Sequence, residues 1–160
     1  QVLGVYDAAL CEPLAKALQQ LGSTHALVLH SEDGLDEISV ASPTHGVEIK
    51  GGVLAPMTIE PSDYGHGFES LDGLQVETAD ASAALIQSAF AGDQDAASRK
   101  ARAIIALNAG AGIYVSGGAE SLAAGIARAD EVLGSGAAAE KLAEFVSFTQ
   151  TLSAQPERGS

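Results

Sequence analysis

Two adjacent carboxylates, Asp36 and Glu37, are the side chains in this sequence best suited to chemistry. They follow an apolar run and the polar turn 31–35 (SEDGL), so we expect them just past the end of a strand. Carboxylate oxygens suit Mg²⁺, an ion that keeps several waters and bridges to substrate phosphates. An acidic pair of this kind could hold a pyrophosphate through Mg²⁺. The alternative is a solvated acidic turn, because consecutive side chains of an extended segment point to opposite faces and can share an ion only on a turn.

Other candidate side chains carry weaker signals. His30 is placed at a strand end, where it would either contact a ligand or cap the sheet. His66 lies between two glycines, which suits a mobile loop, and the spacing of the four histidines matches no metal motif. Cys11 falls in a helical pattern, where a buried, inert thiol is expected. A single cysteine also excludes an internal disulfide framework and a cysteine-rich zinc site.

The sequence contains neither of the common phosphate-binding loops. There is no G-x-x-x-x-G-K-[ST] stretch and no G-x-G-x-x-G stretch after a strand. Gly110 and Gly112 lie inside a helical pattern, and we interpret them as sites of close helix packing. A phosphate would therefore need a metal ion or another segment to supply positive charge.

The charge is strongly negative and unevenly distributed. The 160 residues carry 21 acidic and 8 basic side chains, for a net charge of −13. Residues 1–80 contain 13 of the acids and only two bases, Lys16 and Lys50. Such a surface repels nucleic acid and anionic membranes, so neither is an expected partner.

Length and composition fit about one folded domain of roughly 150 residues. The hydrophobic fraction of 46% excludes a disordered polar chain, and no apolar run is long enough for a membrane span. The opening residues lack the basic region of a signal peptide, and with one cysteine a cytoplasmic location is expected.

The elements that must position the carboxylates form a mixed sheet followed by helices, an α/β fold. A strand over 2–6, a helix capped by Asp7 and closed by Gly22, and a buried parallel strand over 26–30 come first. Three further strands are expected over 36–41, 46–50 and 53–60, and Pro56 indicates a sheet edge or bulge in the last one. Residues 61–80 form a long loop of the kind that is often functional.

After residue 80 the pattern becomes alanine-rich and helical. The expected helices are 81–91, a second capped by Asp93 and running to about Ser116, then 121–133 ended by Gly134, and 137–152. Residues 1–155 would form one partial α/β domain and 156–160 a polar tail. Whether the last two residues are native is left open.

Five stretches, in this order, resemble the anthranilate phosphoribosyltransferase family and cover nearly the whole chain: QVLGVYDAALCEPLAKALQQLG (1–22), ALVLHSEDGLDEISVASPT (26–44), IEPSDYGHGFESLDGL (59–74), LNAGAGIYVSGGAESLAAGIARADEVLGSGAAAEKL (107–142) and FVSFTQ (145–150). GLDEIS, the DYG-containing loop and LNAGA are jointly specific. The resemblance implies the large α/β domain of a class II nucleoside phosphorylase-like fold. It also implies transfer of phosphoribosyl from phosphoribosyl pyrophosphate to anthranilate, with Mg²⁺ on Asp36 and Glu37, in a homodimer of the tryptophan pathway.

The chain also departs from the family. Its GTGGD pyrophosphate loop, its Lys-His-Gly-Asn stretch and its anthranilate-contacting arginine lie upstream, and none of these patterns occurs here. We therefore expect the N-terminal half of the enzyme to be missing and the 160-residue chain alone to be inactive. The alternatives are a pyrimidine nucleoside phosphorylase-like enzyme, a non-catalytic relative that binds nucleic acid, or a purely structural fragment. The GLDEIS stretch argues against the first and the net charge against the second.

Overall fold

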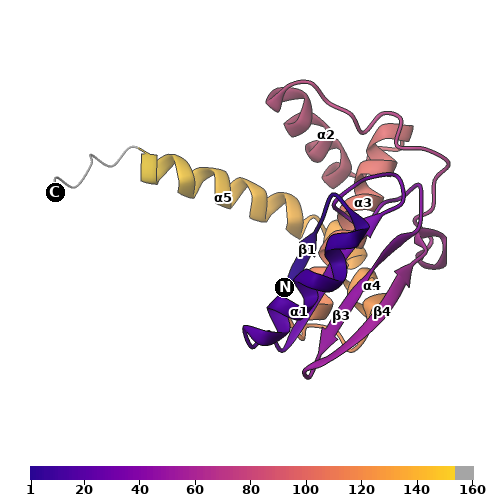
Figure 1. Cartoon of the computed structure of the whole chain (residues 1–160). Helices are drawn as coiled ribbons and strands as arrows, with labels where there is room; N and C mark the ends of the chain where they lie inside the picture. Colours follow the sequence, from indigo (N-terminus) through magenta and orange to yellow (C-terminus); the bar gives the residue numbers. More distant parts are fainter. Residues whose placement is uncertain (154–160) are drawn as a thin grey trace.

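The computed structural model describes residues 1–153, which form a small sheet with helices on both faces and a last helix that extends away from them (Figure 1). The four strands are β1 (Val2–Gly4), β2 (His25–Ser31), β3 (Thr44–Lys50) and β4 (Val53–Ile59), in spatial order β1-β2-β3-β4. β1 and β2 are parallel, whereas β2 with β3 and β3 with β4 are antiparallel. The predicted mixed α/β sheet is thus confirmed, with β1 and β4 at its edges. Pro56 lies in edge strand β4, where its missing N–H does not interrupt the sheet.

β2 is buried on both faces and divides the core in two. Leu27 and Leu29 pack in a cluster with residues of helices α3 (Ala96–Val115) and α4 (Leu122–Ser135). Ala26 and Val28 point to the other face and pack with residues of α1 (Cys11–Gln20). The apolar run 26–30 is therefore a central strand with helices on either side, as its lack of polar alternation predicts.

The first connection runs as predicted. Asp7 accepts a hydrogen bond from the Ala9 N–H at the start of the short 3₁₀ helix η1 (Ala8–Leu10), which leads into α1. Gly22 follows α1 with a φ of +88°, a conformation that glycine adopts without strain. Cys11 is buried as expected, and burial together with the nearby Asp7 charge raises the pKa of its thiol.

The helical half follows the predicted order with shifted boundaries. The 3₁₀ helix η2 (Pro61–Tyr64) lies in the long loop, and α2 (Ala79–Ala91) starts two residues earlier than expected. The cap of α3 is Asp95, which accepts from the N–H groups of Ala97 and Ser98, so the assignment to Asp93 was wrong. α4 continues through Gly134 and ends at Gly136, before α5 (Ala137–Ser153). The polar tail 156–160 lies outside the described residues.

Close packing of α3 against α4 explains the glycines of the LNAGAG stretch. A Cβ on Gly110 would lie 2.5 Å from the Cα of Ile126, and one on Gly125 would lie 2.3 Å from the Gly110 carbonyl oxygen. The interpretation of Gly110 as a packing site is confirmed, whereas Gly112 has no atom within 4 Å of an added Cβ. No helix within residues 1–153 combines the length and the apolar character needed to cross a membrane.

Candidate functional site

Asp36 and Glu37 lie in the loop that joins the carboxyl end of β2 to β3. Both side chains are exposed, and residues 36 and 37 form a bend. The predicted strand over 36–41 is wrong, because these residues pair with no strand of the sheet. The predicted position, on a turn just beyond β2, is correct.

One side chain of α3 holds this loop by its backbone. The Ile38 N–H donates to Asn108 Oδ1 at 2.9 Å, and Asn108 Nδ2 donates to the Ile38 carbonyl oxygen, also at 2.9 Å. Asn108 thus supplies both hydrogen bonds that a neighbouring strand would otherwise make. The alternating apolar residues that suggested a strand, Ile38 and Val40, are fully buried in the cluster under β2. The alternation arises because two loop residues are buried in the core, and not because the segment is a strand.

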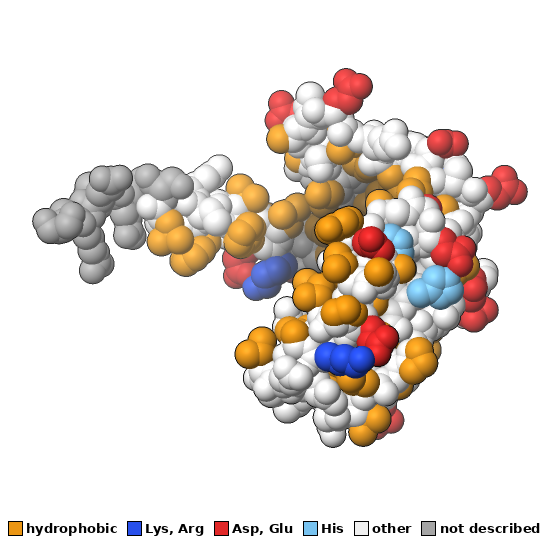
Figure 2. Space-filling model, viewed as in Figure 1, with side chains coloured by type: hydrophobic (Ala, Val, Ile, Leu, Met, Phe, Trp, Pro, Cys, Tyr) orange, Lys and Arg blue, Asp and Glu red, His pale blue; other side chains and the backbone are white. Residues whose placement is uncertain are grey.

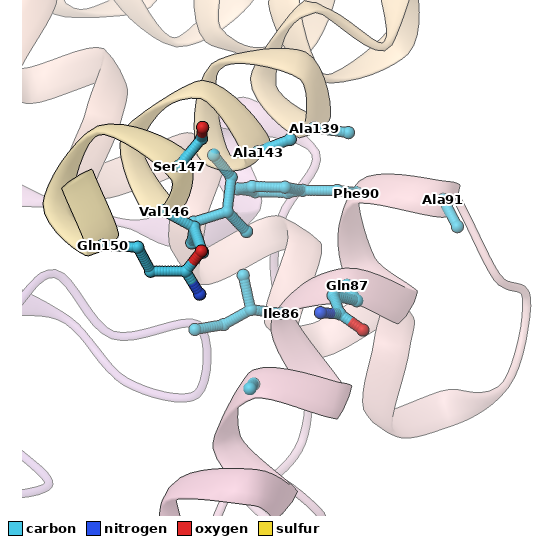
Figure 3. A pocket seen from close by; sticks show the side chains of 11 residues that line it. Ile86, Gln87, Phe90, Ala91, Ala139, Ala143, Val146, Ser147 and Gln150 are labelled. Carbon is cyan, nitrogen blue, oxygen red and sulfur yellow. The ribbon is translucent and has the colours of Figure 1, made fainter. Parts of the chain in front are cut away.

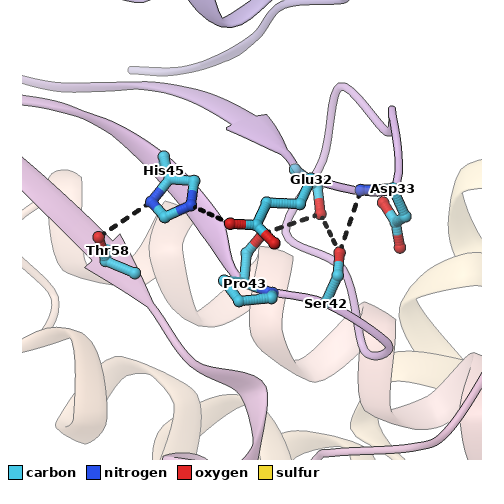
Figure 4. Close-up of polar contacts among 7 residues, drawn as sticks. Glu32, Asp33, Ser42, Pro43, His45 and Thr58 are labelled. Carbon is cyan, nitrogen blue, oxygen red and sulfur yellow. Dashed lines mark hydrogen bonds and ion pairs between the residues drawn. The ribbon is translucent and has the colours of Figure 1, made fainter.

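The base of the loop is joined to the sheet by a second set of hydrogen bonds. The Asp33 N–H donates to Ser42 Oγ at 3.2 Å, and His45 on β3 bridges Glu32 at 2.7 Å and Thr58 at 3.0 Å (Figure 4). Burial raises the pKa of the Asp33 carboxyl, but hydrogen bonds from Ser39 and other loop donors outweigh it and hold that pKa below its ordinary value. These hydrogen bonds hold the base of the loop in place against the sheet.

A glycine brings the end of β1 against the same loop. A Cβ on Gly4 would lie 1.4 Å from the Asp36 carbonyl oxygen, so no larger residue fits there without moving the loop. Because β1 and β2 are parallel, their carboxyl ends meet at one edge of the sheet. Asp36 and Glu37 lie at this edge, which is the usual position of ligands in α/β sheets.

The two carboxylates suit a hard cation but do not enclose one. Within residues 1–153 neither makes a hydrogen bond or ion pair with another side chain, so their oxygens are available to a ligand. The same residues contain no group of three or more His, Cys, Asp or Glu side chains able to hold a metal. Two exposed carboxylates fit a Mg²⁺ ion that draws its remaining oxygens from water and substrate.

An apolar hollow of about 420 Å³, which the sequence did not reveal, adjoins the pair. Beside Asp36 and Glu37 it is lined mainly by aliphatic residues, among them Leu71 and Leu74 of the long loop, Ile86 of α2 and Ile104 of α3. These residues belong to three separate segments. No Lys or Arg lines the hollow, so any phosphate there would require charge from elsewhere.

The histidines fill structural roles. His30 Nδ1 lies 2.9 Å from the Val5 carbonyl oxygen. Of the two roles predicted for His30, this contact fits capping of the sheet. His66 Nε2 lies 3.0 Å from Asp130 Oδ2 of α4 and its side chain is 14% exposed, so the 61–80 loop is docked at this point rather than mobile.

A polar network occupies the opposite end of the sheet. Glu48 Oε1 of β3 lies 2.9 Å from His25 Nε2 of β2 and accepts from the Tyr114 hydroxyl of α3 at 2.7 Å. Lys50 donates to the same hydroxyl at 3.0 Å, and this hydrogen bond raises the pKa of Lys50. The sequence showed no sign of this network, because its members are brought together only by strand register and by the position of α3.

Comparisons with known proteins identify the family of the chain. Residues 1–139 match the family model described as glycosyl transferase family, a/b domain. The chain is 52% identical over 149 residues to the anthranilate phosphoribosyltransferase of Teredinibacter turnerae, and 54% identical over 149 residues to that of Saccharophagus degradans. Each alignment covers 93% of this chain and 44% of the relative, so the chain spans less than half the length of these relatives.

Solved structures of anthranilate phosphoribosyltransferases are also similar to this chain in fold. The anthranilate phosphoribosyltransferase of Thermus thermophilus superposes with a TM-score of 0.78 at 33% identity, over 92% of this chain and 42% of that chain. The Saccharomyces cerevisiae enzyme in complex with PRPP and Mg reaches the same TM-score at 23% identity, which shows the likeness of fold.

Proposed function

The chain belongs to the glycosyl transferase family, a/b domain, and we propose that it is the carboxylate-bearing part of an anthranilate phosphoribosyltransferase. The complete enzyme would transfer phosphoribosyl from phosphoribosyl pyrophosphate to the amine of anthranilate. The observation that carries the proposal is the identity of 52% over nearly the whole chain with a relative of that name. The same relatives favour this activity over a nucleoside phosphorylase.

Asp36 and Glu37 are proposed to hold Mg²⁺ at the carboxyl end of β2. When bound there, the ion would neutralise the developing charge of the pyrophosphate leaving group. The chain's own contribution is positional: Asn108 fixes the backbone of the loop, and Gly4 allows the loop to pack against β1. Both carboxylates then stay exposed on a bend, where they can share one ion.

The remaining parts of the site are proposed to come from a segment outside this chain. Among the bases only Lys16, on α1, and Lys50, which pairs with His25 at the start of β2, precede residue 99, whereas the carboxylates follow the last residue of β2. A phosphate cradle and the anthranilate contacts would belong to the N-terminal half, with residues 1–155 as one partial domain. The proposal includes a cytoplasmic location and a homodimer of the complete enzyme.

The test is the double substitution Asp36→Ala with Glu37→Gln in the complete enzyme. Loss of electrostatic stabilisation at a leaving group costs roughly 100- to 1,000-fold in rate, so turnover of anthranilate should fall by about that factor and lose its Mg²⁺ dependence. Thermal stability should hold or rise slightly, because the change removes two exposed, mutually repelling charges. Kinetics against Mg²⁺ concentration and a thermal melt on the same protein measure both.

Wild-type rates and Mg²⁺ dependence in the double variant would show that the pair is only an acidic turn. The control is the 160-residue chain alone, verified by intact mass and N-terminal sequencing, which should show no turnover. Robust activity of that sample would refute the proposed division of the site between two segments.

A further inference from the structure

A hydrogen bond between Asp33 and Ser39 closes the loop that carries Asp36 and Glu37. Ser39 Oγ donates to Asp33 Oδ2 at 2.5 Å, and Ser39 is fully buried. A hydroxyl that donates to a carboxylate makes a charge-assisted hydrogen bond, which is roughly twice as strong as one between neutral groups. The contact therefore joins the two ends of segment 33–39, and the carboxylate pair lies near the middle of that segment.

Both side chains of this contact are held by further hydrogen bonds. Ser39 Oγ accepts from the Ala41 N–H at 3.0 Å, so its own proton is left for Asp33. The Ser39 N–H donates to Thr44 Oγ1 at the start of β3, at 3.1 Å. On the other side, Asp33 Oδ1 accepts from the Leu35 N–H at 3.4 Å. The contact is thus fixed to β3 at one end and to the loop backbone at the other.

The residues on either side of the carboxylate pair are also held by their backbones. The Leu35 carbonyl oxygen accepts from the Ser31 N–H at 3.0 Å, and Asn108 binds both backbone groups of Ile38. Consecutive side chains of an extended segment point to opposite faces, so the two carboxylates can share one ion only while the bend is maintained. Repulsion between their charges favours opening of the bend, and the hydrogen bond across the loop opposes it.

The carboxylate pair differs from the adjacent acids of α4. Figure 2 shows acidic side chains on several parts of the surface, so exposure alone does not distinguish the pair. Asp130 of α4 lies 3.0 Å from His66, and Glu131 accepts from Arg128 at 2.9 Å. In the loop beyond β2, by contrast, the hydrogen bonds are made by the neighbours of the pair, and the oxygens of the pair stay available.

The hollows near the pair offer no further charged side chain from residues 1–153. Of the described residues that line the hollow of about 420 Å³, Asp36 and Glu37 alone are charged. Ile86 of that hollow also lines a groove of about 590 Å³ against α5, where Figure 3 shows Val146 on the other side, and no described residue of the groove is charged. Because no neighbouring charge fixes the two carboxylates, their orientation depends on the loop itself.

We propose that Asp33 and Ser39 are positioning residues for Mg²⁺ binding, and that their hydrogen bond maintains the bend on which Asp36 and Glu37 share one ion. The inference rests on the proposed function. Mg²⁺ requires a nearly octahedral set of oxygens, so its affinity falls when the two carboxylates can move apart. Asp33 is not itself a ligand in this scheme, because its carboxylate is occupied by donors of the loop and residues 1–153 contain no group of three metal-binding side chains.

The experiment compares Ser39→Ala with Ser98→Ala in the complete enzyme. Ser98 is a matched control, because it is also buried and its side chain hydrogen-bonds a carboxyl, which lowers the pKa of Asp95. It lies roughly 15 Å along α3 from Asn108. Losing a group that orients a metal ligand weakens metal binding roughly 10- to 100-fold, so Ser39→Ala should raise the Mg²⁺ concentration for half-maximal turnover by at least about 10-fold while kcat at saturating Mg²⁺ is largely retained. Ser98→Ala should leave that concentration unchanged.

Two further measurements make the test independent of activity and of the folding of one variant. The Leu35 N–H, which donates to Asp33, should exchange its hydrogen faster in Ser39→Ala and as slowly as in the wild type in Ser98→Ala. Asp33→Asn weakens the same hydrogen bond at an exposed residue, so it removes no buried group and should shift the half-maximal Mg²⁺ concentration in the same direction. A thermal melt establishes that each variant is folded.

Wild-type Mg²⁺ dependence in Ser39→Ala and Asp33→Asn would overturn the inference. Equal shifts in Ser39→Ala and Ser98→Ala would also overturn it, because they would reflect lost stability alone. Faster exchange at Leu35 without a change in Mg²⁺ dependence would show that the hydrogen bond orders the loop but does not position the carboxylates. If the wild-type enzyme has no Mg²⁺-dependent transfer, the proposed function fails and this inference fails with it, whereas wild-type behaviour of the loop variants rejects this inference alone.

Discussion

Charged residues at the two ends of the sheet differ in their exposure and in their hydrogen-bond partners. At the carboxyl end of β2, Asp36 and Glu37 are exposed and make no ion pair within residues 1–153. At the other end, Glu48 contacts His25 and Tyr114, and the Tyr114 hydroxyl also accepts from Lys50. The first end leaves its two carboxylates exposed to solvent, and the second satisfies charge within the fold.

One helix supports both ends. Asn108 and Tyr114 lie on α3, and Asn108 binds the loop only through backbone atoms of Ile38. Tyr114 instead contacts side chains of the strands, and its ring packs edge-on against His25 with centroids 4.6 Å apart. The backbone of the loop is thus held by α3 while its two carboxylates stay free. The proposed metal site would need this preorganisation for electrostatic stabilisation.

The largest effect on stability is expected at the paired end. Tyr114→Ala should lower the free energy of unfolding by about 3–5 kcal/mol, as other large aromatic truncations do, because it leaves a cavity and removes the hydroxyl between Glu48 and Lys50. Tyr114→Phe keeps the ring and should cost only about 1–2 kcal/mol. Urea denaturation of both variants measures this, and equal losses would mean that the ring contributes nothing beyond its hydroxyl.

At the carboxylate end, Asn108→Ala should cost about 2–4 kcal/mol. It leaves the N–H and carbonyl of the fully buried Ile38 without partners, and each unsatisfied group costs about 1–3 kcal/mol. Asn108→Asp retains the acceptor and should be intermediate. Hydrogen exchange of the 36–40 backbone should quicken in Asn108→Ala and stay slow in Tyr114→Phe. Unchanged exchange in Asn108→Ala would mean that the loop does not depend on α3.

Two glycines of α3 test whether its close packing against α4, which positions α3 under both ends of the sheet, stabilises the protein. Gly110→Ala should destabilise the protein by about 1–3 kcal/mol, because its Cβ would lie 2.5 Å from the backbone of Ile126. Gly112→Ala, two residues away on the same helix and with open space around it, should stabilise by about 0.5–1 kcal/mol. Chemical denaturation of the two variants gives the comparison directly. Effects of the same sign would argue against the close α3–α4 contact.

The smallest effect concerns pH at the base of the loop. The pKa of Asp33 is lowered in the folded protein, so its contribution to stability is present above the unfolded value of about 3.9 and is lost as the pH falls through the folded value. The melting temperature of the wild type should exceed that of Asp33→Asn at pH 6, and the difference should shrink below about pH 4. A difference that is constant between about pH 3 and pH 7 would exclude this linkage.

Much of the fold followed from local pattern. The apolar run 26–30 predicted a central strand, and the alternation around Val47 and Ile49 predicted a half-exposed one. Gly22 and Gly92 marked the ends of two helices. The errors were also local. Ile38 and Val40 alternate like a strand, and Asp93 resembles a cap as closely as Asp95 does. Periodicity reports which side chains are buried, and it does not report which partner receives the backbone hydrogen bonds.

By itself the sequence determined the residue types: two adjacent carboxylates beyond a buried strand, a strongly acidic first half without a phosphate loop, and an alanine-rich helical second half. Those choices limit the chemistry, because only hard oxygen ligands are offered at that position. Only the tertiary structure decided that Asn108, 70 residues from Ile38, would hold the loop, and that Glu48 would meet Tyr114. It also decided that Ile86 would line both the groove against α5 and the hollow beside the carboxylates. Contacts between distant residues depend on register and helix packing, which no short window of sequence contains.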